Sequence, residues 1–79
     1  MTVTIIATNE TMGLHEEYVG VDYDLVTIKE VKSRKFKGYV STKIRIKRGK
    51  RDIVLSSGSY DTMTIQDEET GRYLLRYTR

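Results

Sequence analysis

The chain has 79 residues and a formal net charge of +3, with 14 basic and 11 acidic side chains. This length allows a single domain with a small core, which we expect to span residues 1–79. Cysteine is absent, which excludes disulfides, thiolate metal sites and a cysteine nucleophile. No apolar stretch approaches the roughly 20 residues that span a bilayer. The start, MTVTIIATNE, lacks the basic region of a signal peptide, so we expect a soluble, cytoplasmic protein.

The first third of the chain predicts two strands and a corner. Residues 2–8 form an apolar, threonine-rich strand, and residues 9–13 form a turn with asparagine and glycine at its ends. Strict alternation then places one set of side chains on a common strand face: Val19, Val21, Tyr23 and Leu25. The apolar parity changes between Leu25 and Val26, which predicts a bulge or tight corner near Asp24–Val26. The following strand should end at about Val31.

Residues 39–48, YVSTKIRIKR, form the clearest strand pattern, and we expect this strand near the middle of a sheet. The even positions are apolar or small, and Val40, Ile44 and Ile46 should be buried. The odd positions are polar: Tyr39, Ser41, Lys43, Arg45 and Lys47. A basic loop, residues 32–38, precedes the strand. Gly49 follows it and can supply the positive φ of a hairpin turn.

The last third predicts three more short strands. DIVLS is followed by a turn at residues 57–61, and TMTIQ and RYLLRYT are joined by DEETG, which suits a turn closed by a glycine bulge. Tyr73, Leu75 and Tyr77 share one face of the last strand, and we expect Tyr73 and Tyr77 in the core.

These patterns predict an all-β protein with about six to seven short strands. At most one helical turn is expected, within residues 9–18. Strands at this spacing favour a small antiparallel barrel or a strongly curved sheet, since closing a sheet removes exposed edges. The size is that of SH3-like and OB-like barrels, an analogy of size and strand number only.

Charge is strongly segregated along the chain. Residues 1–28 contain five acids and no lysine or arginine, whereas residues 29–51 contain eleven basic residues and one acid, Glu30. Residues 52–79 contain three arginines and five acids. An ordinary solvated face mixes both signs, so this segregation favours a polyanionic or acidic partner.

The predicted strand converts this segregation into candidate binding residues. Lys43, Arg45 and Lys47 project from one face at roughly 6.8 Å intervals, close to the spacing of successive phosphates. The complete candidate set adds the hairpin tip, the preceding loop and two aromatic residues: Arg48, Lys50, Arg51, Arg34, Lys35, Lys37, Tyr39 and Phe36. Tyr39 shares the basic face and Phe36 lies among basic residues, so both are candidates for base stacking.

Two functions fit this pattern. In the first, a small basic β protein binds nucleic acid non-specifically through its phosphates, with DNA and RNA left open. In the second, the protein is a non-enzymatic interaction module, such as a phage or mobile-element inhibitor or an assembly subunit, whose basic face docks on an acidic protein surface. A homodimer is a further expectation, in which the acidic residues 1–28 of one copy cover the basic stretch of another.

Catalysis and cofactors are not expected. His15 is the only histidine, and no cluster of metal-ligand spacing accompanies it. Ser56, Ser57 and Ser59 surround a glycine in a turn without a nearby base. The acidic run of residues 67–69 reads as a solvated hairpin tip, and glycine-rich phosphate loops are absent.

Overall fold

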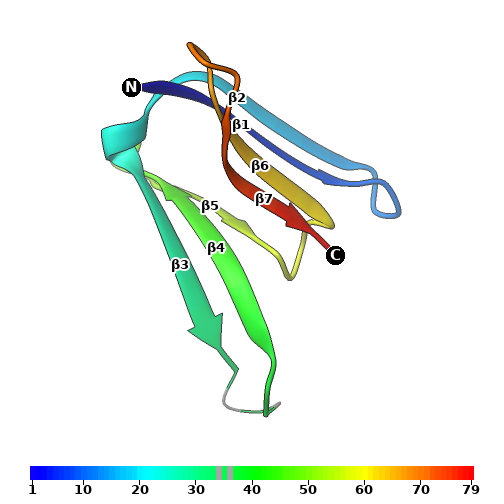
Figure 1. Ribbon diagram of the computed structural model, residues 1–79. Coiled ribbons are helices and arrows are strands. Elements are labelled where there is room, and N and C mark those ends of the chain that lie inside the picture. The colour runs from blue at the N-terminus through cyan, green and yellow to red at the C-terminus, as the bar shows by residue number, and fades with distance from the viewer. Residues whose placement is uncertain (34, 36) are drawn as a thin grey trace.

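The computed structural model describes residues 1–33, 35 and 37–79, and within them the fold is all-β (Figure 1). Seven strands form in chain order: β1 (Thr2–Asn9), β2 (Leu14–Asp22), β3 (Val26–Lys32), β4 (Val40–Ile46), β5 (Ile53–Ser56), β6 (Thr62–Asp67) and β7 (Tyr73–Thr78). A single 3-10 turn, η1 (Tyr23–Leu25), separates β2 from β3. The all-β prediction and the number of strands are therefore confirmed.

The strands form two separate antiparallel sheets. One has four strands in the order β2-β1-β6-β7, and the other has three in the order β3-β4-β5. Neither sheet closes into a barrel over the described residues, so the predicted barrel is not confirmed. The η1 corner turns the chain from the first sheet into the second, and β3 pairs with β4 rather than with β2.

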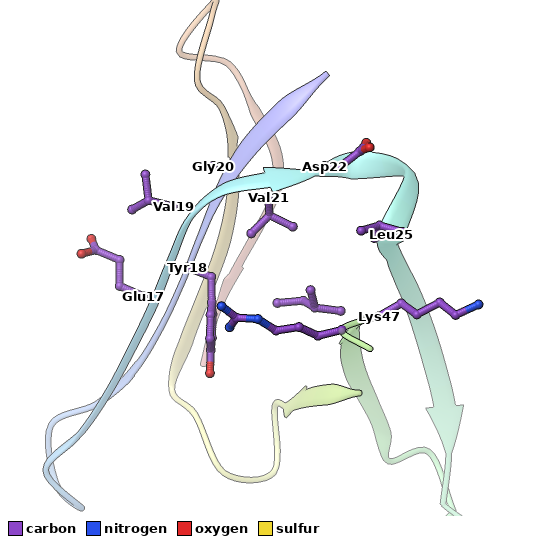
Figure 2. Close-up of a pocket in the computed structure, with 10 residues that line it drawn as sticks. Glu17, Tyr18, Val19, Gly20, Val21, Asp22, Leu25 and Lys47 are labelled. Atoms are coloured by element: carbon purple, nitrogen blue, oxygen red, sulfur yellow. The ribbon is translucent and has the colours of Figure 1, made fainter. Parts of the chain in front are cut away.

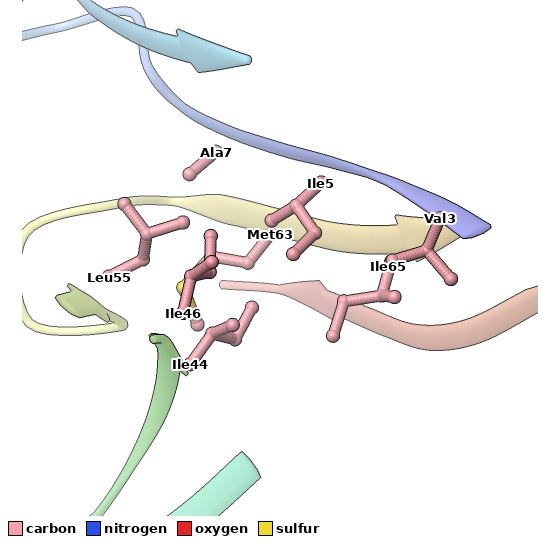
Figure 3. Packing of buried hydrophobic residues seen from close by; sticks show 8 residues of the cluster. All are labelled: Val3, Ile5, Ala7, Ile44, Ile46, Leu55, Met63 and Ile65. Atoms are coloured by element: carbon pink, nitrogen blue, oxygen red, sulfur yellow. The ribbon is translucent and has the colours of Figure 1, made fainter. Parts of the chain in front are cut away.

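A small core lies between the two sheets (Figure 3). The four-stranded sheet contributes Val3, Ile5 and Ala7 from β1 with Met63 and Ile65 from β6, and the three-stranded sheet contributes Ile44, Ile46 and Leu55. The predicted position of β4 in the middle of its sheet and the burial of Ile44 and Ile46 are thus confirmed. Val40 is 44% exposed, so its predicted burial is wrong. The β3–β4 hairpin extends past the end of the core, and Val40 lies on that extension (Figure 1).

A β-bulge interrupts β2 and changes which side chains face the core. Val21 lies opposite Val3, but Tyr18 lies opposite Ile5, so β2 has one extra residue at Val19–Gly20. Gly20 has φ +71°, a conformation that favours glycine. Tyr18 and Val21 consequently pack against the core, whereas Val19 is 68% exposed. The prediction that Val19 and Val21 share one face is therefore wrong.

The Glu68 carboxylate ties this bulge to the neighbouring strand. Its Oε1 accepts a hydrogen bond from the Gly20 N–H at 2.7 Å and another from the Thr4 hydroxyl at 2.8 Å. Glu68 follows β6, so one side chain of the β6–β7 turn contacts both β1 and β2. The acidic tip therefore has a structural role that its sequence did not indicate.

The corner between the two sheets is confirmed, although its form is a 3-10 turn. Asp22 caps η1, and its carboxylate accepts a hydrogen bond from the Asp24 N–H at 3.0 Å. The Tyr23 N–H donates to the Met1 carbonyl at 3.0 Å, which anchors the start of the chain beside the corner. The helical turn considered within residues 9–18 does not form, because this segment is a turn followed by β2.

A second bulge, at Leu74, changes which side chains of β7 face the core. Ile65 lies opposite Leu75 while Gln66 lies opposite Tyr73, which leaves Leu74 as the extra residue. Leu75 and Tyr77 pack against the core, as expected for Tyr77. Tyr73 is exposed, and the Arg76 guanidinium lies 4.8 Å from the centre of its ring, so its predicted burial is wrong.

The four-stranded sheet, the three-stranded sheet and η1 account for the secondary structure of the described residues. Among them, no helix is long and apolar enough to cross a membrane.

Ile44→Ala should lower the free energy of unfolding by about 2–5 kcal/mol, because Ile44 is fully buried between the sheets. Val40→Ala, on the same face of the same strand but exposed, should change it by less than about 1 kcal/mol. Urea denaturation measures both. Equal losses for the two variants would contradict this register of β4.

Glu68→Ala should destabilise the fold by about 1–2 kcal/mol, because two hydrogen bonds to its carboxylate are lost at the exposed edge. Hydrogen exchange at the Gly20 amide should accelerate at the same time. Glu69→Ala is the matched control, since it removes the neighbouring exposed carboxylate without touching β1 or β2. Unchanged exchange at Gly20 in Glu68→Ala would show that the bulge does not depend on this contact.

Candidate nucleic-acid interface

The register of β4 separates its apolar and basic side chains onto opposite faces of the three-stranded sheet. Ile44 and Ile46 point into the core. Because strand side chains alternate, Lys43 and Arg45 project from the other side, which we call the outer face. Both side chains are exposed, as the sequence predicted.

The outer face acquires a third cation from the neighbouring strand. Lys29 on β3 lies directly opposite Lys43, and Thr27 lies opposite Arg45. On the other side, Val54 of β5 lies opposite Arg45. Five side chains line a shallow hollow of about 140 Å³ at this place: Thr27, Lys29, Lys43, Arg45 and Val54. Lys29 was not among the residues singled out from the sequence.

The pairing of Lys29 with Lys43 is electrostatically unfavourable in the free protein. Like charges directly opposite each other on an antiparallel pair destabilise a sheet, by up to about 1 kcal/mol. Within the described part of the chain, the acidic contact of this cluster joins Arg45 to Asp52 at 3.9 Å, and the Arg45 side chain is 62% exposed. An ion pair this exposed contributes little to the stability of the fold. The outer face therefore keeps most of its positive charge available to a ligand.

Lys47 and Arg48 lie beyond the end of β4 and line a different hollow. The Lys47 N–H donates to the Leu25 carbonyl at 2.8 Å, which continues the β3–β4 pairing by one residue. A cleft of about 450 Å³ lies here between β2 and the end of β4, and Figure 2 shows Tyr18 and Val21 directed into it while Val19 points away. Leu25 and Ile46 also line this cleft. The sequence grouped Lys47 with Lys43 and Arg45, and the structure distributes them over two neighbouring hollows.

The remaining basic residues of this hairpin tip are exposed. Gly49 has φ +61°, which confirms the predicted role of this glycine in the turn. The Arg51 N–H donates to the Arg48 carbonyl at 3.3 Å, and Lys50 and Arg51 point to solvent. They lie at the β4–β5 connection, at the end of β4 that is nearer Arg45 than Lys43.

The other end of β4 carries the predicted loop residues. Lys35 and Lys37 are exposed, and Tyr39 is exposed just before the strand. The Ser33 N–H donates to the Tyr39 carbonyl at 2.9 Å, so the β3–β4 ladder continues one pair past Lys32 and Val40. Arg34 and Phe36 lie outside the described residues, and the roles predicted for them stay predictions.

Tyr18 lines this cleft, and its surroundings raise the pKa of its phenol. Burial raises the pKa of its phenol, and a hydrogen bond to Glu16 at 3.1 Å, together with the negative charge of that carboxylate, raises it further. The positive charge of Arg48 acts in the opposite direction. The Tyr18 hydroxyl is therefore a hydrogen-bond donor at neutral pH.

The residues weighed for catalysis occupy other parts of the structure. His15 is exposed on β2, opposite Thr8. Ser57 is buried, its N–H donates to the Thr42 carbonyl, and its hydroxyl accepts from the Thr42 N–H at 2.9 Å, so it joins β4 to the β5–β6 turn. Hydrogen bonding from the Glu69 N–H lowers the pKa of Asp67. Across the described part of the chain, no three His, Cys, Asp or Glu side chains gather where they could hold a metal ion.

Comparisons with known proteins give no family for this chain. No family model, no curated protein and no solved structure matches it significantly.

Proposed function

We propose that this protein binds nucleic acid non-specifically, through phosphate contacts to the outer face of the three-stranded sheet. The observation that supports this most strongly is the cross-strand pair of Lys29 and Lys43, with Arg45 beside it in one hollow. Three cations from two strands converge there, and the fold bears the cost of their repulsion. A phosphate between them would reverse the sign of that interaction.

The spacing and chemistry of the outer face suit a phosphate backbone. Lys43 and Arg45 are separated by roughly 6.8 Å along β4, and Lys29 lies one strand away, at roughly 4.5–5.5 Å between Cα atoms. Thr27 adds a hydroxyl, and Arg45 adds a planar group that can donate two hydrogen bonds to one phosphate. None of these contacts reads a base, so binding should be indifferent to sequence.

The binding constant should fall steeply with salt concentration. Each phosphate contact releases condensed counterions, so the three cations of the outer face predict a slope of log K against log salt of about −2 to −3. Lys43→Glu should flatten this slope and weaken binding about tenfold or more for every oligonucleotide tested. Fluorescence anisotropy with a labelled generic oligonucleotide measures both quantities.

Arg72→Glu is the matched control, because it makes the same charge change at an exposed position near the β6–β7 turn of the other sheet. It should change binding much less than Lys43→Glu. Absence of wild-type binding at low salt would reject the proposal, and the basic face would then fit an acidic protein surface. The molecular mass in solution, measured on the same samples, tests the expected homodimer.

Lys29→Glu should weaken nucleic-acid binding while it stabilises the free protein. The substitution places a carboxylate opposite Lys43, which replaces a like-charge pair by an opposite-charge pair, worth about 0.2–1 kcal/mol. Chemical denaturation and the binding assay give the two values. Lys32→Glu is the control, because Lys32 lies opposite the uncharged Val40. This substitution should change the free energy of unfolding by less than about 0.5 kcal/mol. A Lys29→Glu protein that is both more stable and equally active in binding would show that Lys29 does not contact the ligand.

A further inference from the structure

The three-stranded sheet narrows to two strands at Thr42. Ser57, just after β5, is the last residue on that side to pair with β4, through the two hydrogen bonds to the Thr42 backbone. Beyond this point β3 and β4 continue alone, with Val31 opposite Ser41 and Lys32 opposite Val40. Residues 30–33 and 39–42 form this end of the β3–β4 hairpin, which we call the arm, and Figure 1 shows it extending past β5 and away from the four-stranded sheet.

Both faces of the arm are open to solvent. On the outer face Val31 is 38% exposed and Tyr39 is 48% exposed, and on the opposite face Val40 is 44% exposed. A two-stranded hairpin is at best marginally stable in water. Apolar groups exposed on both faces indicate a partner that surrounds the arm rather than one that covers a single side.

The charge of the arm indicates a polyanion as that partner. Lys32 lies on the arm, Lys35 and Lys37 are exposed at its end, and Glu30 is its one acid. At its base lie Lys29, Lys43 and Arg45, the cations of the outer face. Among the described residues, positive charge thus follows the hairpin from the hollow at its base to Lys35 and Lys37 at its far end.

We propose that the arm enters the major groove of double-stranded DNA with its Ser33–Tyr39 end leading, while Lys29, Lys43 and Arg45 contact the phosphates at the groove edge. This inference rests on the proposed function and specifies double-stranded DNA as the nucleic acid that is bound. A B-form major groove is about 12 Å wide and 8.5 Å deep, and it admits a two-stranded β-ribbon. Three residues on each strand of the arm, 31–33 and 39–41, lie beyond the Thr42–Ser57 pair and span roughly 7–10 Å, which is comparable to the depth of the groove. Ser57 and β5 lie beside β4 from Thr42 onward, and this third strand would stop further entry.

The same geometry argues against the other nucleic acids. An A-form RNA duplex has a deep and narrow major groove that does not admit such an element. A single strand offers phosphates to the outer face but has no groove for the arm. Wild-type protein should therefore bind a 16-base-pair DNA duplex about tenfold more tightly than the RNA duplex of the same sequence.

An arm-shortened variant tests the inference directly. Residues 32–40 are replaced by a two-residue Asn-Gly turn between Val31 and Ser41. Ser33 and Tyr39 form a hydrogen-bonded pair of the β3–β4 ladder. Val31 and Ser41 lie opposite each other two residues further along each strand. They therefore occupy the equivalent hydrogen-bonded position, which suits a two-residue turn. The core and the outer-face cations are untouched. Thermal melting verifies that the variant is folded.

A charge-matched control keeps the arm at full length. It carries Lys32→Ser, Arg34→Ser, Lys35→Ser and Lys37→Ser, which remove the same four positive charges as the shortened variant. The control should bind more weakly with a shallower salt dependence but keep its preference for the DNA duplex. The shortened variant should lose that preference to within about twofold.

Dimethyl sulfate protection locates the arm on the duplex, because the reagent methylates guanine N7 in the major groove and adenine N3 in the minor groove. Wild-type protein should protect guanine N7, and the shortened variant should not. Equal wild-type affinity for DNA and RNA duplexes, protection at adenine N3 alone, or the same loss of preference in both variants would overturn groove insertion while leaving phosphate binding intact. Failure of the wild type to bind any oligonucleotide would reject the proposed function itself, and this inference with it.

Discussion

The burial of Ile44 between the two sheets determines how the rest of the molecule presents its charge. Ile44 and Ile46 contact the apolar side chains of β1 and β6, so β4 can adopt only one orientation relative to the core. Strand side chains alternate with a period of two, and a slip of one residue would bury Lys43 and Arg45 instead. The cost of burying those cations is many times larger than the repulsion between exposed ones. The outer face is therefore basic because the inner face is apolar.

The same register explains why the cations converge. Ile28 lies opposite Ile44, so Lys29 lies opposite Lys43 on the outer face. Nothing in the core requires a lysine at position 29, since an uncharged or acidic side chain could occupy this exposed site without disturbing Ile28. A locally unfavourable residue of this kind is typical of binding sites, where function can reduce stability. The arm is also unfavourable for the free protein, because both of its faces are exposed and its apolar groups remain in water. The same explanation, a role in binding, therefore applies to it.

Local pattern in the sequence was sufficient for the hairpins and for β4. Alternation predicted the faces of Ile44 and Lys43, and Gly49 marked the turn between β4 and β5. The two bulges were missed because a single inserted residue reverses the alternation on one side of it, as at Gly20 and Leu74. An isolated glycine within a strand pattern is itself a signal for a bulge, so the break at Gly20 was available in the sequence.

Local sequence patterns could not predict which strands pair when they lie far apart in the chain. The pairing of β1 with β6 joins the two ends of the chain and creates the four-stranded sheet, and no local feature specifies it. The separation into two sheets, rather than one closed barrel, depends on this pairing and on the η1 corner. Lys29 could have been found, because a hairpin in which Val31 pairs with Ser41 also places Lys29 opposite Lys43. To identify Lys29 from the sequence, one must assign which residues of the two strands pair, and counting basic residues is not sufficient.

Nuclear magnetic resonance titration of ¹⁵N-labelled protein with a short unlabelled DNA duplex is the most direct measurement of where the ligand binds. The account predicts large amide shift changes at Thr27, Lys29, Lys43, Arg45 and Val54, which line the hollow of the outer face, and entry of the arm into the groove adds changes along residues 30–33 and 39–42. Amides of β1, β6 and β7 should change little. Shifts centred on the four-stranded sheet, or on the cleft beside Tyr18 and Leu25, would contradict the assignment of the outer face as the binding surface.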